Sequence, residues 1–436
     1  MRVFVSEFIC GGGLSGEPLP DSLQREGRAM LWAVVDDLLQ ISGCHVSTTL
    51  DARLAHDANE RRSPQCQIEI VANVDEERRQ FDVLTAASDA VLVIAPETNG
   101  SLARRVRRVV SLGAKSLNCS PDAIELCGDK LHLARHFEGH ALPTLPTQLL
   151  DWSSLLATQT VFIKNLSKNN TNRKRERGRE SSGIRPHSRF RLVSIKKRCN
   201  SWTSSMDSKR NIVPHPTPTA DGRAQAPTTG SDLDPVSEWV IKPRDGAGSW
   251  LTFRVRTDSP DEWQRAATAY AAAGVAHKAL IQPFVAGRPL SVGCHCPTNG
   301  EVEIFPIGQQ RLSRDFQYMG GSIPASLPTR TEVAVHDLVR RACATIPGLC
   351  GHIGFDLLLP DADPTRPLIV EINPRLTTSY VGYRRLSASN LAARWIHNAN
   401  PLNDANISPR SLTPLEWSPR RIEFDASGNT LFDDAP

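Results

Sequence analysis

The sequence lacks the long apolar runs that a membrane protein needs. No stretch approaches the ~18 consecutive apolar residues that cross a bilayer, although 40% of the 436 residues are hydrophobic. The N-terminal run MRVFVSEFIC is interrupted by Ser6 and Glu7 after a few apolar residues, which is not the pattern of a signal peptide. We therefore expect a cytoplasmic protein without a membrane partner.

Paired cysteine motifs are also missing. Ten cysteines are present, but none has the CxxC spacing of a zinc site. The one close pair, Cys294 and Cys296, alternates along an expected strand, so both thiols share one face. We expect reduced structural thiols, because disulfides are rare in a reducing cytoplasm.

The chain is long enough for about three domains at ~150 residues each. Its first 125 residues alternate between strand and helix patterns, which predicts a parallel α/β sheet. The strands are expected at Val3–Ile9, His45–Leu50 and Ala90–Ile94, and the helices at Leu23–Leu39 and Leu102–Leu112. Glu97 follows the last of these strands, at the carboxyl edge where open α/β sheets bind ligands, and is a candidate substrate contact.

Gly11, Gly13 and Gly16 have the GxGxxG spacing of a dinucleotide fingerprint. In a true fingerprint the helix begins within the glycines and directs its N-terminus at the pyrophosphate. Here two prolines intervene, and the helix signals start only at Asp21. We favour a loop over the substrate cleft, and keep an NAD(P)-dependent oxidoreductase as an alternative.

The segment GHIGFDLLLPDADPTRPLIVEINPR places acidic and amide side chains on two expected neighbouring strands. Asp356 lies on the first strand. Glu371 and Asn373 are two apart on the second, so they point to one face, with Arg375 just beyond. Oxygen ligands on paired strands suit Mg²⁺, which takes one or two carboxylates together with water and phosphate. The competing interpretation is a polar strand edge followed by a turn.

Three upstream segments add to this pattern. In VIKPRDGAGSW, a strand carries Lys242 and breaks into a glycine loop, where backbone amides can approach phosphate oxygens while the lysine supplies charge. ALIQPFVAG is an apolar strand interrupted at Gln282 and Pro283, whose backbone could follow an adenine edge. Asp129 and Lys130 open an amphipathic stretch earlier in the chain. A glycine-rich turn alone is weak support, and the order of the segments is what makes the pattern specific.

In this order, the Asp129-Lys130 start, the VIKPRDGAGS strand and loop, the QPFVAG hinge and the GFD and EINPR strands resemble the ATP-grasp superfamily. The EINPRLTTSYVG ending and the Gly-x-Pro-x-Ser segment from Gly287 to Ser291 are most similar to carboxylate-amine ligases of the tyramine–L-glutamate ligase type. The resemblance implies the α/β (α+β) ATP-grasp fold, in which a Rossmann-like parallel sheet precedes two α+β subdomains that clasp ATP.

The resemblance also implies a role for each matching residue. The residues expected to bind ATP are Lys130, Lys242, Gly246, Gly248, Ser249, Gln282, Pro283, Phe284 and Val285. Asp356 and Glu371 are expected to bind one Mg²⁺, and Glu371 and Asn373 a second, with Mn²⁺ as an alternative ion. Arg375 is the expected catalytic residue, because its planar donor fork suits the charge of a transferred phosphoryl group.

The implied activity is ligation of a carboxylate to an amine through an acyl phosphate, with release of ADP and phosphate. A bicarbonate-using carboxylase or carbamoyl-phosphate-type enzyme is the alternative within the superfamily. The expected partners are the small-molecule carboxylate and amine, with a homodimer left open. Gln310, Arg311 and Tyr318 are candidate substrate contacts, and polar surface on a turn is their competing interpretation.

The composition changes sharply between residues 164 and 210, where 15 Lys and Arg face three acids. This stretch and the Pro- and Thr-rich one after it show no periodicity, so we expect a disordered insertion at 165–236. Aromatic residues interleave little with the basic ones, and no RNA-binding signature is present, so nucleic acid is not an expected partner. The expected domains are a Rossmann-like domain at 1–125, an ATP-grasp domain at 126–400 and a tail at 401–436.

Overall fold

We analysed a computed structural model, which describes residues 1–61, 63–152, 237–246, 248–298, 301–399 and 414–432. Most of the described residues belong to one compact unit, which holds Met1–Leu150 and Trp239–Val255 and resumes at Asp261. The insertion expected at 165–236 lies outside the described residues. Within the described residues, no helix combines the length and apolarity that a membrane span requires.

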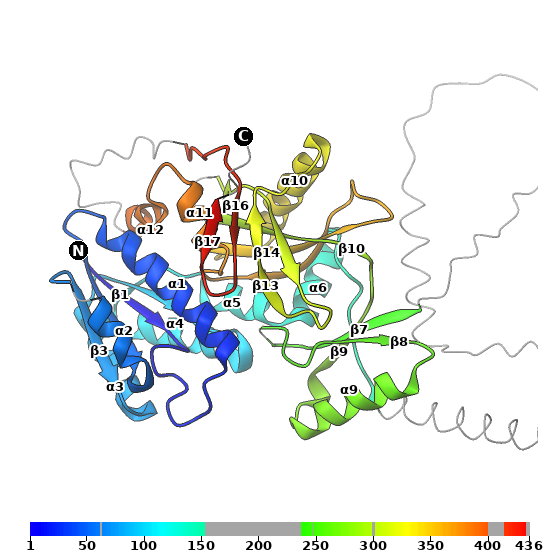
Figure 1. Ribbon diagram of the computed structural model, residues 1–436, viewed down its shortest axis with the longest axis horizontal. Coiled ribbons are helices and arrows are strands. Elements are labelled where there is room, and N and C mark those ends of the chain that lie inside the picture. The colour runs from blue at the N-terminus through cyan, green and yellow to red at the C-terminus, as the bar shows by residue number, and fades with distance from the viewer. Residues whose placement is uncertain (62, 153–236, 247, 299–300, 400–413, 433–436) are drawn as a thin grey trace, which may run out of the picture. The chain divides into compact units, whose positions relative to one another are not determined.

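The N-terminal part is a five-stranded parallel sheet in the order β3-β2-β1-β4-β5 (Figure 1). Its strands are β1 Arg2–Glu7, β2 His45–Asp51, β3 Cys66–Val71, β4 Ala90–Ile94 and β5 Lys115–Ser116. Its helices are α1 Asp21–Leu39, α2 Ala55–Glu60, α3 Val74–Ala87 and α4 Ser101–Ser111. The expected parallel α/β sheet is confirmed. Strand β3 and helix α3 were not among the expected elements. Strand β3 is half-exposed, and its short alternating pattern is a weak signal.

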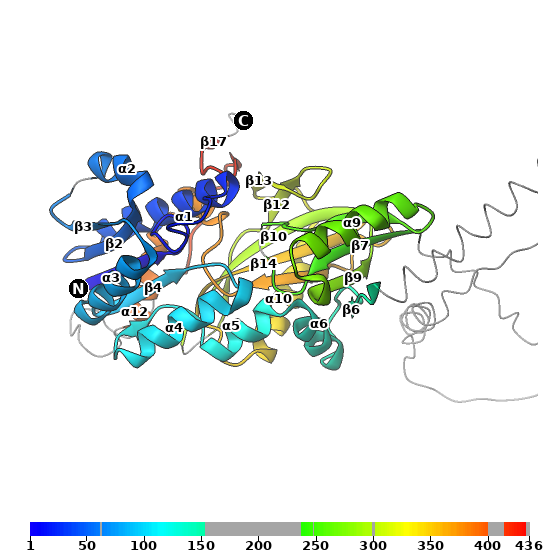
Figure 2. The same cartoon turned by 90° about the horizontal axis from the view of Figure 1, so that it is seen from below.

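Two helices, α5 Pro121–Gly128 and α6 Lys130–Gly139, lead from this sheet to a second, four-stranded sheet. Its order is β6-β9-β7-β8, with β6 Gln148–Leu149, β7 Glu238–Pro243, β8 Phe253–Arg256 and β9 Ala279–Pro283. Helix α9, Pro260–Ala272, lies along this sheet (Figure 2) and buries Trp263, Ala266 and Tyr270. This sheet carries both the Lys242 strand and the Gln282 strand, which pair antiparallel with Val240 opposite Gln282.

The third sheet is the largest and carries the residues that are expected to bind metal. Seven strands follow the order β15-β14-β10-β12-β13-β16-β17, and β11 pairs with β10. They are β10 Gly287–Cys296, β11 Glu303–Ile304, β12 Gly308–Leu312, β13 Tyr318–Ile323, β14 Gly351–Pro360, β15 Leu368–Asn373, β16 Ile422–Phe424 and β17 Thr430–Phe432. The expected hairpin from Ile353 to Asn373 forms as β14 and β15, with Asp356 opposite Glu371.

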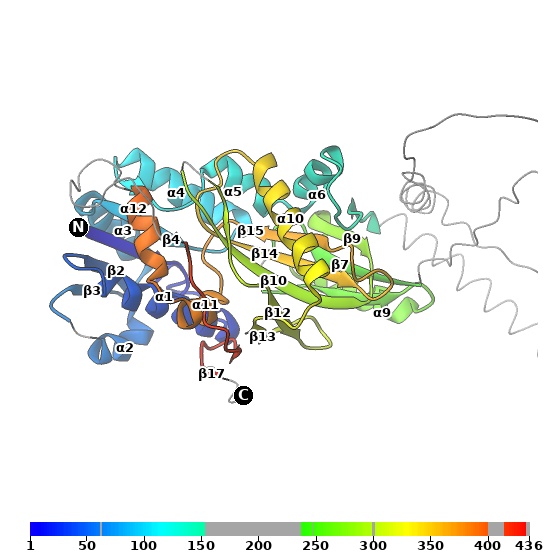
Figure 3. The ribbon, with the colours of Figure 1, turned by 90° about the horizontal axis from the view of Figure 1, so that it is seen from above.

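Helix α10, Thr329–Thr345, lies along this sheet (Figure 3), and its Val335, Leu338 and Val339 pack in one core cluster with Phe355. Three thiols meet in the same core, since the sulfur atoms of Cys294, Cys296 and Cys343 lie within 4.8 Å of one another. All three are free and buried in an apolar environment, which is where small hydrophobic side chains pack.

Helix α1 packs against both the N-terminal sheet and helices near the C-terminal end of the chain. One side of it packs on β1, and the other on α11, Tyr380–Leu386, and α12, Leu391–Ala399. Asp37 of α1 accepts a hydrogen bond from Tyr380 Oη at 2.5 Å and two from the Arg384 guanidinium at 2.9 and 2.6 Å. Asp37 is 5% exposed, so these bonds hold α1 against α11 in a nearly dry environment.

The segment expected as a simple tail contributes to the fold. Strand β16 pairs with β13, with Ile422 opposite Ile323, and β17 completes the edge. Ile422 and Phe424 are buried on either side of a half-buried Glu423. A three-residue strand is too short to give a periodic signal, which is why the sequence did not reveal it.

Candidate active site

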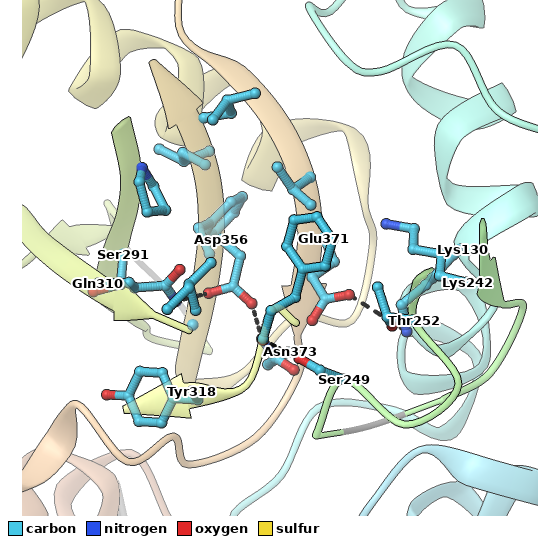
Figure 4. Close-up of a pocket in the computed structure, with 18 of the residues that line it drawn as sticks. Lys130, Lys242, Ser249, Thr252, Ser291, Gln310, Tyr318, Asp356, Glu371 and Asn373 are labelled. Atoms are coloured by element: carbon cyan, nitrogen blue, oxygen red, sulfur yellow. Dashed lines mark hydrogen bonds and ion pairs between the residues drawn. The ribbon is translucent and has the colours of Figure 1, made fainter. Parts of the chain in front are cut away.

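A cavity of about 370 Å³ lies between the sheet that holds β7 and β9 and the hairpin of β14 and β15. Figure 4 shows its polar side chains in two groups, with Asp356, Glu371 and Asn373 on one wall and Lys130 and Lys242 facing Glu371. The structure therefore brings the expected metal ligands and the expected phosphate-binding lysines to one cavity, although 226 residues separate Lys130 from Asp356 in the numbering.

The three oxygen-bearing residues are close together because β14 and β15 pair in register. Asp356 lies opposite Glu371, and Gly354 lies opposite Asn373. Asn373 Nδ2 donates a hydrogen bond to Asp356 Oδ2 at 3.1 Å, and Gln310 Nε2 donates to Asp356 Oδ1 at 2.6 Å. Gln310 reaches this position from β12, which lies beyond β10 in the same sheet.

The two carboxylates titrate together. Burial and the neighbouring charge of Glu371 raise the pKa of Asp356. Burial would raise the pKa of Glu371 as well, but the ammonium groups of Lys130 and Lys242 outweigh burial and lower it. A pair of adjacent, partly buried carboxyl groups that retains a proton can exchange that proton for a divalent cation. The donor set, two carboxylates and one amide oxygen, therefore fits Mg²⁺.

The two lysines come from different elements. Lys130 is the first residue of α6, and its Nζ lies 3.4 Å from Glu371 Oε2 and donates to the Gly246 carbonyl at 2.6 Å. Lys242 is on β7 and is 7% exposed. Burial lowers the pKa of Lys242 to about 8, since the charge of Glu371 only partly offsets the cost of removing an ammonium group from water.

Asp129 orders the start of α6 and the beginning of the glycine loop. Its side chain accepts from the backbone amides of Leu131 and His132, which caps the helix. The same carboxylate accepts from Arg244 Nε at 2.8 Å, and the Arg244 carbonyl accepts from the Lys130 amide at 3.0 Å. The capping residue thus places Lys130 beside the loop that follows β7.

The loop after β7 forms one wall of the cavity through Gly246, Gly248 and Ser249. Gly248 and Ser249 have positive φ angles of 63° and 58°, a region that glycine adopts without strain. Ser249 Oγ donates to the carbonyl of Phe316 at 2.6 Å, which fastens the loop to the β12–β13 turn.

The expected adenine-binding segment also lines the cavity. Gln282, Pro283, Phe284 and Val285 are all on its wall. Gln282 Nε2 donates to Thr147 Oγ1 at 2.7 Å, and the Arg254 guanidinium lies 3.7 Å from the centre of the Phe284 ring. Those contacts order two side chains of this segment by a hydrogen bond and a cation–π interaction.

Arg375 faces the cavity and pairs with Glu97 behind it. Arg375 Nε lies 2.9 Å from Glu97 Oε1, and only 14% and 9% of the two side chains are exposed. Arg375 Nη2 also donates to Asn373 Oδ1 at 3.5 Å. Glu97, which the sequence placed among the substrate contacts, is not on the cavity wall, because its carboxylate is occupied by this ion pair.

The other expected substrate contacts are on the paired strands β12 and β13, and they do not all face the cavity. Gln310 and Tyr318 line the cavity. Arg311 does not, because adjacent residues of a strand point to opposite faces. Its guanidinium instead lies 2.7 Å from Glu423 Oε2 and donates to the Phe424 carbonyl. In this structure Arg311 thus holds β16 against the sheet and does not face the cavity.

The GxGxxG glycines lie in the loop between β1 and α1, and α1 begins only at Asp21. No glycine of the motif is at the N-terminus of the helix, as the intervening prolines indicated. The dinucleotide interpretation thus lacks the helix N-terminus that would receive a pyrophosphate.

Several cavity residues escaped the sequence-based interpretation. They include Glu26 on α1 and the residues Thr252, Thr377, Thr378 and Ser379. The last three begin two residues after Arg375 in the quoted EINPRLTTSYVG segment, so their closeness in sequence to the expected metal ligands was a usable signal. Glu26 had no such signal, because it comes from a helix far away in the sequence.

The fold and these residues agree with the family comparisons. The ATP-grasp domain family matches residues 205–379, and the pre ATP-grasp 3 domain family matches residues 44–124. The chain therefore contains an ATP-grasp domain, with a pre-ATP-grasp domain ahead of it.

One curated relative is tyramine–L-glutamate ligase from Methanocaldococcus fervens. It is 32% identical over 122 residues, which are 28% of this chain and 38% of the ligase. The match thus spans little more than a third of that ligase's length.

Solved structures of ATP-grasp proteins share the fold. An ATP-grasp superfamily protein from Archaeoglobus fulgidus aligns with 98% of this chain and 92% of its own, at 18% identity and a TM-score of 0.57. Biotin carboxylase from Campylobacter jejuni aligns with 97% of this chain and 74% of its own, at 12% identity and a TM-score of 0.59. N5-carboxyaminoimidazole synthetase from Staphylococcus aureus, complexed with ADP, covers 97% and 81% at 11% identity and a TM-score of 0.55. At such identities the likeness establishes the fold alone.

Proposed function

We propose that this protein is an ATP-dependent carboxylate-amine ligase. The observation that carries the proposal is the single cavity in which Asp356, Glu371 and Asn373 face Lys130 and Lys242. A carboxylate does not react with an amine directly, because its leaving oxide is strongly basic. Transfer of a phosphoryl group to the carboxylate replaces that oxide with phosphate, and the site has the charges that such a transfer needs.

The proposed reaction has two steps. In the first, a carboxylate oxygen bonds to the γ-phosphorus of ATP while the bond from that phosphorus to the ADP oxygen breaks. In the second, the amine nitrogen bonds to the carbonyl carbon, the carbon–oxygen bond to phosphate breaks, and nitrogen loses its proton. The products are an amide, ADP and phosphate, and the chain contributes positioning and charge more than covalent chemistry.

The nucleotide would occupy the side of the cavity formed by the second sheet. Lys242 and Lys130 would bind the phosphates, and with a pKa of about 8 most of the Lys242 side chains keep their charge at neutral pH. Gly246, Gly248 and Ser249 would cover the phosphates, with their backbone amides available as donors. The Gln282–Val285 segment would frame the adenine.

Asp356, Glu371 and Asn373 would hold Mg²⁺, with Glu371 shared if two ions bind. When bound, the ion neutralises phosphate charge and lowers the barrier to phosphoryl transfer. Arg375 would donate to the transferred phosphoryl group and then to the acyl phosphate. Glu97 would keep its guanidinium oriented, because the ion pair holds one edge of the fork.

The relative from Methanocaldococcus fervens supplies the first substrates to test, L-glutamate and tyramine. Purified protein with Mg²⁺ and ATP should release ADP only when both an acid and an amine are present. A wider panel of amino acids and amines follows if this pair is inactive, and labelled bicarbonate in the same assay tests the carboxylase alternative.

Glu371→Gln is the variant that tests the site. It removes one charge from the proposed metal ligands, so we expect at least a 100-fold loss of ADP release. Asp361→Asn is the matched control, since Asp361 is an exposed acid in the turn of the same hairpin. Equal activity of both variants would contradict the proposed site, and amine-independent incorporation of bicarbonate would contradict the proposed reaction.

A further inference from the structure

One carboxylate in the cavity is not among the residues proposed to bind metal. Glu26, on α1, lines the same cavity as Tyr318 and Thr378. Its Oε2 accepts a hydrogen bond from Thr378 Oγ1 at 3.5 Å. Within the described part of the chain no ion pair involves Glu26, whereas Glu371 has Lys130 and Glu97 has Arg375.

The position of Glu26 follows from the way α1 is anchored. Glu26 and Asp37 are 11 residues apart, which is close to three helical turns, so they share one face of α1. Asp37 is bonded to Tyr380 and Arg384 of α11. The same face, further toward the N-terminus of α1, therefore meets the segment that precedes α11 and contains Thr378.

The charge of Glu26 acts on the reactive part of the cavity. Burial raises the pKa of Glu26, and the nearby Arg375 offsets this in part. In turn, burial first and then the charge of Glu26 raise the pKa of Tyr318. Glu26 thus lines the same cavity as Arg375 and Tyr318, and its charge influences both residues.

We propose that Glu26 binds the protonated amine substrate and accepts a proton from it before the amine attacks the acyl phosphate. The inference rests on the proposed function and adds the amine subsite to it. An ammonium group gives one proton to the Glu26 carboxylate, and the neutral nitrogen then bonds to the carbonyl carbon. The carbon–oxygen bond breaks, phosphate leaves with the electron pair, and it takes up the second proton of nitrogen.

Hydroxylamine separates this role from acyl phosphate formation. It is uncharged at neutral pH and traps acyl phosphates as hydroxamates, so it requires neither an anionic subsite nor a base. The assay compares two reactions of the full-length protein with Mg²⁺, ATP and L-glutamate, or another acid that the panel identifies. One uses hydroxylamine as the nucleophile, and the other uses tyramine or the active amine.

For Glu26→Gln we expect kcat/KM for the amine to fall about 10- to 100-fold more than kcat/KM for hydroxylamine, because a partly buried charge-assisted contact is lost. Glu26→Asp should recover part of the amine reaction. Asp21→Asn is the control, since it makes the same charge change at an exposed position of α1. Urea unfolding of each variant establishes that the fold is kept.

Different outcomes would contradict the role of Glu26 and the proposed function. Equal losses with both nucleophiles, or a raised KM for the acid alone, would overturn the inference and assign Glu26 to the acid substrate or to the fold. A wild-type protein that forms no hydroxamate with any acid of the panel would overturn the proposed function, and the amine subsite with it.

Discussion

Arg375 and Glu97 form an ion pair that is almost shielded from water, with 14% and 9% of their side chains exposed. A buried pair costs more to break than to keep, because removal of one charge leaves the other without compensation. Arg375 is also the residue whose orientation the proposed chemistry depends on. At the residue scale, then, we infer that Glu97 acts on the proposed site through Arg375, as a positioning residue.

Replacement of Glu97 should therefore affect stability and turnover together. For Glu97→Gln we expect a loss of about 2 kcal/mol in the free energy of unfolding in urea, since a hydrogen bond between charged groups is lost. The kcat for ADP release should fall at least 10-fold while the KM for ATP changes little, because no phosphate-binding lysine is touched.

Glu125→Gln is the control for that measurement. It breaks the ion pair with Arg107, in which 52% and 45% of the side chains are exposed. Such exposed pairs contribute little to stability, because water and salt screen the two charges. If Glu97→Gln behaves like Glu125→Gln in both stability and kcat, Glu97 does not position Arg375.

At the scale of elements, strands β10 and β14 form the centre of the largest sheet and carry two buried histidines opposite each other. His295 and His352 are paired in register and are 1% and 5% exposed. Burial, together with nearby positive charge, lowers the pKa of His295 to about 4 and that of His352 to about 3. Both side chains are therefore neutral in the folded protein at neutral pH.

The buried histidine pair predicts that the folded protein loses stability in acid. Below the ordinary histidine pKa of 6.5, the unfolded chain takes up protons that the folded chain does not. The free energy of unfolding should therefore fall as pH drops from about 6.5 toward 4, by up to about 1.4 kcal/mol per pH unit for each histidine. Urea unfolding across this range measures the slope.

Removal of one histidine should reduce the slope. His352→Gln should show a smaller pH dependence than the wild type, whatever its stability at pH 7. His45→Gln should keep the wild-type slope, because His45 is exposed at the start of β2. Identical slopes in all three proteins would mean that the buried pair does not control acid stability.

At the scale of the whole molecule, the cavity-lining residues that the structure describes lie outside the basic segment. We expect the site to work without that segment. Deletion of residues 168–210 should thus leave kcat/KM for ADP release within about threefold of wild type. If the segment binds nucleic acid, the deletion should also abolish salt-sensitive polynucleotide binding.

A variant of the segment without its charges separates the effect of the segment's length from the effect of its charge. Replacement of its Lys and Arg residues by Gln keeps the length and removes the charge. A large loss of ADP release in the deletion but not in this variant would show that the length of the connection matters. A loss in both would contradict a catalytic site that is independent of the segment.

Local pairing explains which parts of the site could be predicted. Asp356 and Glu371 lie on a hairpin whose strands are adjacent in sequence, and a strand period of two is enough to put Glu371 and Asn373 on one face. Lys242 and Gln282 were identified because each interrupts an apolar strand. The direction of Arg311, away from the cavity, could not be predicted because a turn near the site does not tell which face of the strand is inside.

The sequence by itself determined the class of fold, the ATP-grasp segments and the hairpin that carries the metal-type residues, because each depends on short-range patterns of polarity and spacing. Only the tertiary structure decided that Glu97 orients Arg375, that Glu26 reaches the cavity from α1, and that β16 completes the sheet beside β13. These contacts join residues between about 100 and 350 positions apart, and no local pattern encodes them. They arise because α1 and the C-terminal elements share one hydrophobic core.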